Sequence, residues 1–78
     1  MIQKIKKIIS KKNKTKIICL TAYSKNFATE VDKFADITLV GDSLGSVLYN
    51  YETTRKVTLN NMMEHSKSVR MGIKKSVM

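Results

Sequence analysis

The apolar residues of this chain change their spacing twice in its first half, and this change constrains the fold most. Residues 16–22 contain an unbroken apolar run between polar neighbours, which is typical of a strand buried on both faces of a parallel sheet. Residues 24–35 place apolar side chains at i, i+1, i+4, i+7 and i+8, which predicts a helix with Ser24 as its N-cap. Residues 36–41 form a second apolar run. The order strand, helix, strand predicts a parallel, right-handed βαβ unit.

The second half continues this pattern without completing it. Residues 43–57 predict a long polar loop with one helical turn near its start. Residues 58–71 predict a helix, with Thr58 as its N-cap and Gly72 at the C′ position. Residues 73–78 begin a third strand. The fold class is therefore α/β, and the open sheet edges indicate an excerpt of a larger α/β fold.

The basic residues are concentrated at one end of the chain. The formal net charge is +9, and residues 1–16 carry seven lysines and no acid. Isoleucines at helical spacing predict a short amphipathic helix over residues 2–10, followed by a polar connection at 11–15. A solvated helix face explains this charge, and the alternative is a module that binds nucleic acid or an anionic membrane surface through residues 1–16. No arginine or aromatic side chain interleaves these lysines, so bases have no stacking platform.

Membrane insertion and secretion have no support in the sequence. No apolar run reaches the roughly 18 residues that a spanning helix needs. Lysines interrupt the N-terminal apolar positions, so a signal peptide is not expected. A cytoplasmic protein is the expectation.

Ligands of α/β folds bind at the carboxyl ends of strands, and two such ends occur here. They are residues 20–23 and residues 39–45, and the second contains Asp42 and Ser43 between two glycines. A carboxylate there can hold Mg²⁺, and a hydroxyl can donate to a substrate carboxylate. A strand-ending turn uses the same residue types. The match to G-x-S-x-G also raises a hydrolase, but the only histidine, His65, lies mid-helix beside a glutamate that faces elsewhere.

The run LVGDSLG, followed by VTL and a histidine six residues later, resembles ketopantoate hydroxymethyltransferases over about residues 16–72. The resemblance implies a (βα)₈ TIM barrel, in homo-oligomers, that transfers a hydroxymethyl group from 5,10-methylenetetrahydrofolate to 3-methyl-2-oxobutanoate and so forms 2-dehydropantoate in pantothenate biosynthesis. It implies Mg²⁺ as cofactor, Asp42 as metal ligand, and Asp42 and Ser43 as contacts of the keto acid.

Three departures from the family pattern concern the strand tip and the loop. Ser24 stands where the family has Asp, Asn50 where it has Gly, and Arg55-Lys56 where it has Leu-Pro. The catalytic Glu of the family lies beyond the end of this chain. We therefore expect residues 1–78 to be an incomplete N-terminal part of the barrel, inactive alone, which a complementary downstream fragment would complete. In it, 1–15 are the basic helix and linker, and 16–78 the first βα units.

Overall fold

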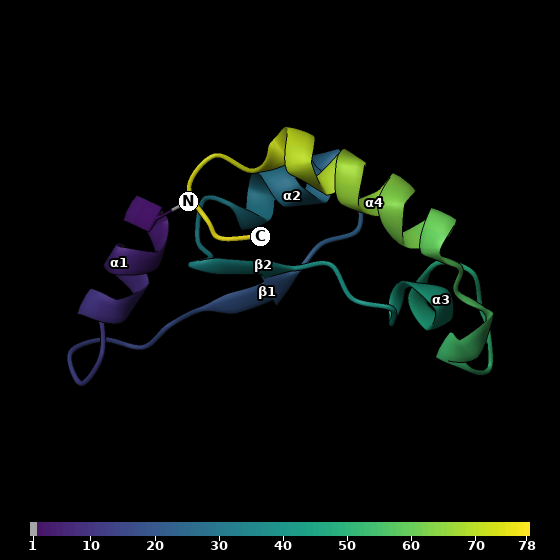
Figure 1. The fold of residues 1–78 in the computed structure, drawn as a ribbon, viewed down its shortest axis with the longest axis horizontal. Helices are drawn as coiled ribbons and strands as arrows, with labels where there is room; N and C mark the ends of the chain where they lie inside the picture. Colours follow the sequence, from purple (N-terminus) through teal and green to yellow (C-terminus); the bar gives the residue numbers. More distant parts are fainter. Residues whose placement is uncertain (1) are drawn as a thin grey trace.

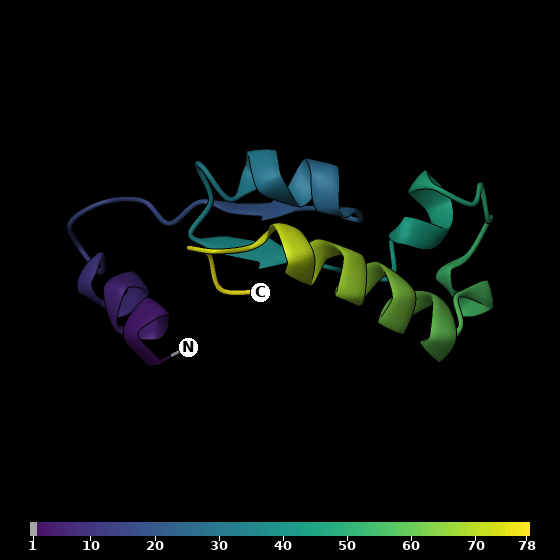
Figure 2. The ribbon, with the colours of Figure 1, turned by 90° about the horizontal axis from the view of Figure 1, so that it is seen from above.

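The structure, a computed structural model, describes residues 2–78 and contains a two-stranded parallel sheet with helices on one face. Its elements in chain order are α1 (Ile2–Ser10), β1 (Cys19–Thr21), α2 (Lys25–Val31), β2 (Ile37–Leu39), α3 (Leu44–Val47), the 3₁₀ helix η1 (Thr54–Lys56) and α4 (Leu59–Gly72). In Figures 1 and 2, α2 and α4 lie along the sheet, while α1 and α3 lie at its opposite ends. The predicted α/β class is confirmed, with strands and α2 shorter than the apolar patterns indicated.

The two strands pair in parallel, as the βαβ prediction required. Leu20 is the partner of Thr38 in the register, with one pair on either side of them. Beyond β2, Val77 forms a parallel bridge to Ile37. The Thr38 amide donates to the Val77 carbonyl at 2.7 Å, and the Val77 amide donates to the Asp36 carbonyl at 2.9 Å. The predicted third strand is thus present as a single bridge beside β2.

The helix pair α2 and α4 supplies most of the core. Ala22, Ala28, Val69 and Ile73 form the buried apolar cluster between the helices and the sheet. Gly72 is the last residue of α4 and not its C′ residue, so that prediction is wrong. A Cβ at this position would lie 2.6 Å from the Lys25 carbonyl oxygen and 2.9 Å from the Ala28 Cβ. The glycine is therefore required because α4 passes directly against the backbone of α2.

The two predicted helix N-caps differ in outcome. Thr58 forms a capping box: its hydroxyl accepts from the Asn61 amide at 3.0 Å, and the Asn61 side chain accepts from the Thr58 amide. Ser24 occupies the N-cap position of α2, but its side chain makes no capping hydrogen bond. The Ser68 hydroxyl accepts from the Lys25 amide at 2.9 Å instead. A side chain of α4 therefore accepts the hydrogen bond of the first backbone amide of α2.

The other face of the sheet is open, which corrects the prediction that the first strand is buried on both faces. All three residues of β1 are exposed. In β2, Thr38 is 1% exposed, whereas Leu39 is 50% exposed. Since successive side chains of a strand point to opposite faces, this contrast separates a helix-covered face from an uncovered one. Within residues 2–78, helices cover one face only. No helix of this part of the chain combines the length and the apolar character needed to cross a membrane.

Candidate functional site at the carboxyl ends of the strands

The two segments that the sequence singled out meet in space. Tyr23 follows β1 and Ser43 follows β2, and their hydroxyl oxygens lie 2.5 Å apart, in hydrogen-bond contact. Parallel pairing places both strand ends at the same edge of the sheet, which is why residues twenty positions apart can touch. The predicted strand-tip site is thus a single location, built by two loops.

Asp42 stands beside Ser43 with an exposed carboxylate. The backbone of this segment is a turn, since the Gly45 amide donates to the Asp42 carbonyl at 3.0 Å and α3 begins at Leu44. The turn accounts for the backbone, but it does not use the carboxylate. Within residues 2–78, no side chain or amide bonds to the Asp42 carboxylate, so it is available to a ligand.

His65 ties this edge of the sheet to the following loop, a role that the sequence did not indicate. Its Nδ1 lies 2.8 Å from the Tyr23 carbonyl oxygen, and its Nε2 lies 2.7 Å from the Tyr49 hydroxyl. A carbonyl can only accept, so Nδ1 carries the hydrogen and Nε2 of the neutral ring accepts from Tyr49. The one available signal was register, because His65 precedes the buried Val69 by four residues and shares its helix face.

The hydrolase alternative finds no geometry here. Ser43 bonds to Tyr23, and both ring nitrogens of His65 bond to other partners. Without a contact between hydroxyl and imidazole, the ring cannot act as a base toward Ser43. The G-x-S-x-G match therefore describes a turn and a short helix, not a nucleophile elbow.

The loop after α3 folds back over Gly45, which is buried. A Cβ at this glycine would lie 2.5 Å from a Val57 methyl and 3.2 Å from the Tyr51 ring, so only glycine admits this packing. Tyr49 and Tyr51 stack with their ring centroids 5.5 Å apart. The loop is thereby held against the strand tip, with the Tyr49 hydroxyl on His65.

Comparison with known proteins identifies the family of this chain. The family model described as ketopantoate hydroxymethyltransferase matches residues 2–78. The chain belongs to the ketopantoate hydroxymethyltransferase family. A Pelagibacter ubique protein named 3-methyl-2-oxobutanoate hydroxymethyltransferase is 67% identical over the whole chain. Relatives of the same name from Rhizobium etli and Agrobacterium fabrum are 52% and 48% identical over 77% and 80% of the chain.

The chain spans only part of these hydroxymethyltransferases. It covers 30% of the Pelagibacter protein and 22% of each of the other two. The match to the Pelagibacter protein covers the whole chain and so includes the strand-tip site described above.

One departure from the family pattern has a structural explanation. Asn50 stands where the resemblance led us to expect glycine, and its φ is +56°. This left-handed region favours glycine, and asparagine is among the few other residues that enter it readily. The loop backbone can therefore keep the geometry that a glycine would allow. Arg55 and Lys56 lie in η1, whose start is capped by the Thr53 hydroxyl.

The residues at the strand tip fit a magnesium ion in part. Within residues 2–78, no three His, Cys, Asp or Glu side chains cluster closely enough to hold a metal by themselves. Mg²⁺, however, commonly uses one or two carboxylates and completes its shell with substrate oxygens and water. The free carboxylate of Asp42 suits the first of these ligands. The remaining ligands would have to come from substrate, water or residues outside this chain.

Proposed function

We propose that this chain supplies the first βα units of a (βα)₈ hydroxymethyltransferase. The reaction transfers a hydroxymethyl group from 5,10-methylenetetrahydrofolate to 3-methyl-2-oxobutanoate and forms 2-dehydropantoate. The observation that carries the proposal is the contact between Tyr23 and Ser43, which joins two parallel strand ends beside the free carboxylate of Asp42. Active sites of (βα)₈ barrels lie at this end of their strands.

In this proposal, Asp42 and Ser43 bind the keto acid, and Asp42 also ligates Mg²⁺. When bound, Mg²⁺ would polarise the keto carbonyl and make the proton on C3 more acidic. If the Tyr23 hydroxyl donates to the Ser43 oxygen, the Ser43 hydrogen is free to point at the substrate carboxylate. Tyr23 would then orient Ser43. We assign no general base to residues 2–78.

The open face of the sheet supports a need for further strands. Leu39 on this face is 50% exposed. In a complete barrel, side chains on the interior face are packed against those of other strands. A barrel of this type takes about 250 residues. We therefore propose that the chain alone does not turn over substrate, and that the remaining βα units, supplied by another polypeptide, would restore activity. Homo-oligomer formation and a cytoplasmic location belong to the same proposal.

A complementation assay tests this. The purified chain is mixed with the part of the Pelagibacter ubique relative that lies beyond the matched segment, in the presence of Mg²⁺ and both substrates. We expect 2-dehydropantoate only from the mixture. Asp42→Asn and Ser43→Ala should reduce its formation by about 10²-fold or more, since each removes a direct substrate or metal contact. Glu52→Gln and Ser46→Ala, which alter exposed residues nearby, are the matched controls.

Three results would contradict the proposal. Turnover by the chain alone would show that the site is complete without further strands. If the mixture with Asp42→Asn were as active as the unsubstituted mixture, the assignment of Asp42 as a metal ligand would be wrong. Absence of activity from a mixture that co-purifies as one folded complex would contradict the complementation proposal.

A further inference from the structure

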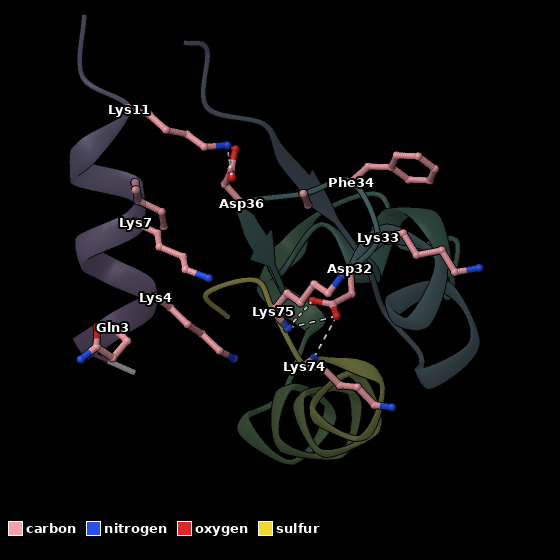
Figure 3. Close-up of a pocket in the computed structure, with 12 residues that line it drawn as sticks. Gln3, Lys4, Lys7, Lys11, Asp32, Lys33, Phe34, Asp36, Lys74 and Lys75 are labelled. Carbon is pink, nitrogen blue, oxygen red and sulfur yellow. Dashed lines mark hydrogen bonds and ion pairs between the residues drawn. The ribbon is translucent and has the colours of Figure 1, made fainter. Parts of the chain in front are cut away.

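A cleft lies at the opposite end of the sheet from Asp42, between α1 and the segments that follow α2 and α4 (Figure 3). Its volume is about 510 Å³, within the range of roughly 300–1,000 Å³ that small-molecule sites occupy. Its lining carries six positive and two negative side chains, a net charge of +4. The charged residues are Lys4, Lys7, Lys11, Lys33, Lys74, Lys75, Asp32 and Asp36.

The two acids offset only part of the positive charge of this cleft, and both carboxylates already have hydrogen-bond partners. The Asp32 carboxylate accepts from the backbone amides of residues 74, 75 and 76 at 2.8–3.1 Å. The Asp36 carboxylate accepts from the Ile18 amide at 2.9 Å and pairs with Lys11 at 2.5 Å. Lys11 is therefore paired with an acid of the lining, and Lys33 is paired with Glu30 at 3.0 Å. Lys4, Lys7, Lys74 and Lys75 form no ion pair within residues 2–78, and Asp32 is the negative charge nearest to Lys74 and Lys75.

Helix α1 turns its basic side toward this cleft. Lys4 and Lys7 of α1, and Lys11 directly after it, recur at i, i+3 and i+7 and extend toward the rest of the molecule (Figure 3). Its apolar side is left exposed, with Ile2 at 70% and Ile9 at 65% exposure. An amphipathic helix ordinarily buries its apolar side.

The polar partners available within the cleft are few. Lys4 Nζ donates to the Ser76 carbonyl at 3.2 Å. Within residues 2–78, Lys7 and Lys75 make no side-chain hydrogen bond or ion pair. The ammonium groups of Lys33 and Lys74 extend away from α1, whereas those of Lys4 and Lys7 extend toward the rest of the molecule (Figure 3). Holding like charges together on a concave surface costs electrostatic free energy, and a multivalent anion would reverse the sign of that contribution.

We propose that this cleft binds a compact phosphate polyanion, a diphosphate or triphosphate group, with Lys4 and Lys7 on one wall and Lys75 on the other. Ammonium groups form strong, charge-assisted hydrogen bonds with phosphate oxygens. Nucleic acid fits less well, because α1 has no arginine and the Phe34 ring, 70% exposed, points away from the cleft (Figure 3). The site is independent of the strand-tip chemistry, since it lies at the other end of the strands.

Isothermal titration calorimetry of the 78-residue chain with inorganic triphosphate tests the proposal. We expect one bound triphosphate per chain, with affinity that falls as salt rises. Lys7→Glu should weaken binding by about ten-fold or more. Lys6→Glu makes the same change of net charge one residue away, outside the cleft lining, and should weaken binding by less than about three-fold. Lys75→Glu, from the other wall, should repeat the effect of Lys7→Glu.

Further probes separate the source of the anion. Similar affinity for ATP and inorganic triphosphate, with no binding of adenosine, would mean that phosphate groups alone are recognised. Tighter binding of ATP, equally sensitive to Lys7→Glu, would mean that a nucleotide is the ligand.

Several outcomes would overturn the proposal. The first is equal weakening by Lys6→Glu and Lys7→Glu, because diffuse attraction would then explain binding. The second is no detectable triphosphate binding. The third is that duplex DNA or anionic vesicles bind more tightly than triphosphate, and that Lys6→Glu and Lys7→Glu weaken this binding equally. That result would favour a macromolecular partner for α1.

Discussion

The imidazole of His65 holds the Tyr23 carbonyl and the Tyr49 hydroxyl, at 2.8 Å and 2.7 Å, and so joins α4 to both loops of the strand tip. Tyr23, Tyr49 and His65 are far apart in the sequence and lie in three different segments. The Tyr23 hydroxyl in turn contacts Ser43. A helix residue whose hydrogen bonds go to neither Asp42 nor Ser43 therefore orders the residues around them.

The first prediction concerns this imidazole. His65→Ala should lower the free energy of unfolding by about 1–3 kcal/mol, because the two partners lose a hydrogen bond in a partly buried setting. Denaturant titration measures the change, and Lys67→Ala, an exposed substitution in the same helix, is the control. In the unsubstituted chain, ¹⁵N chemical shifts of the ring should show the Nδ1–H tautomer. A ring protonated on Nε2 alone would contradict the geometry.

A second prediction uses the contact between α2 and α4. Gly72→Ala should destabilise the chain by about 1–3 kcal/mol, although alanine is the better helix former by about 1 kcal/mol. The reason is that the new methyl would lie 2.6 Å from the Lys25 carbonyl oxygen, so the helices must move apart. Gly41→Ala is the matched control, because its nearest neighbours would lie at 3.9 Å. Equal effects of both substitutions on the denaturation midpoint would refute the close approach.

A third prediction is the acid dependence contributed by Asp32. Burial acts to raise the pKa of this carboxyl, but hydrogen bonds from the amides of Ser76, Lys74 and Lys75 outweigh it and hold the pKa below the ordinary 3.8. Because the folded pKa is depressed, this stabilisation is complete above the ordinary pKa. It is lost as the pH falls through the folded value.

Asp32→Asn should therefore be less stable than the unsubstituted chain at neutral pH, by about 1–3 kcal/mol. The difference should shrink as the pH falls below 3.8 and then through the lower pKa of this carboxyl in the folded chain. Denaturant titrations at several pH values measure it. Glu30→Gln, which removes an exposed carboxylate of α2 that pairs with Lys33 at the surface, controls for the loss of charge. A difference that does not change with pH would contradict the assignment.

The fourth prediction concerns the left-handed loop position. Asn50→Gly should leave stability nearly unchanged, whereas Asn50→Val should cost about 1–2 kcal/mol, since a β-branched residue is strained at a φ of +56°. The same replacement by valine at Glu52, an exposed neighbour outside the left-handed region, is the control. If Asn50→Val and Glu52→Val behave alike in thermal unfolding, the backbone conformation assigned to Asn50 is wrong.

Much of the local structure could be predicted from the sequence. The change of apolar spacing is a short-range property, and it located both strands, the amphipathic helix α1 and the helix α4 with its Thr58 cap. The run of glycine, aspartate and serine after β2 marked a strand tip, and its motifs pointed to a family that the comparisons confirm. The roles assigned to Asp42 and Ser43 at that tip stay predictions.

The tertiary structure alone decided which distant groups touch. His65 belonged to the motif that carried the resemblance, but the sequence did not indicate its role, since its two hydrogen bonds exist only because α4 packs across the end of β1. Gly72 looked like a helix terminator, but the backbone of α2 determines the need for a glycine there. The basic side of α1 faces inward although its apolar pattern is that of a docking helix. Apolar periodicity shows which face of a helix or strand is apolar. The segment that packs against that face depends on long-range contacts, which no short stretch of sequence encodes.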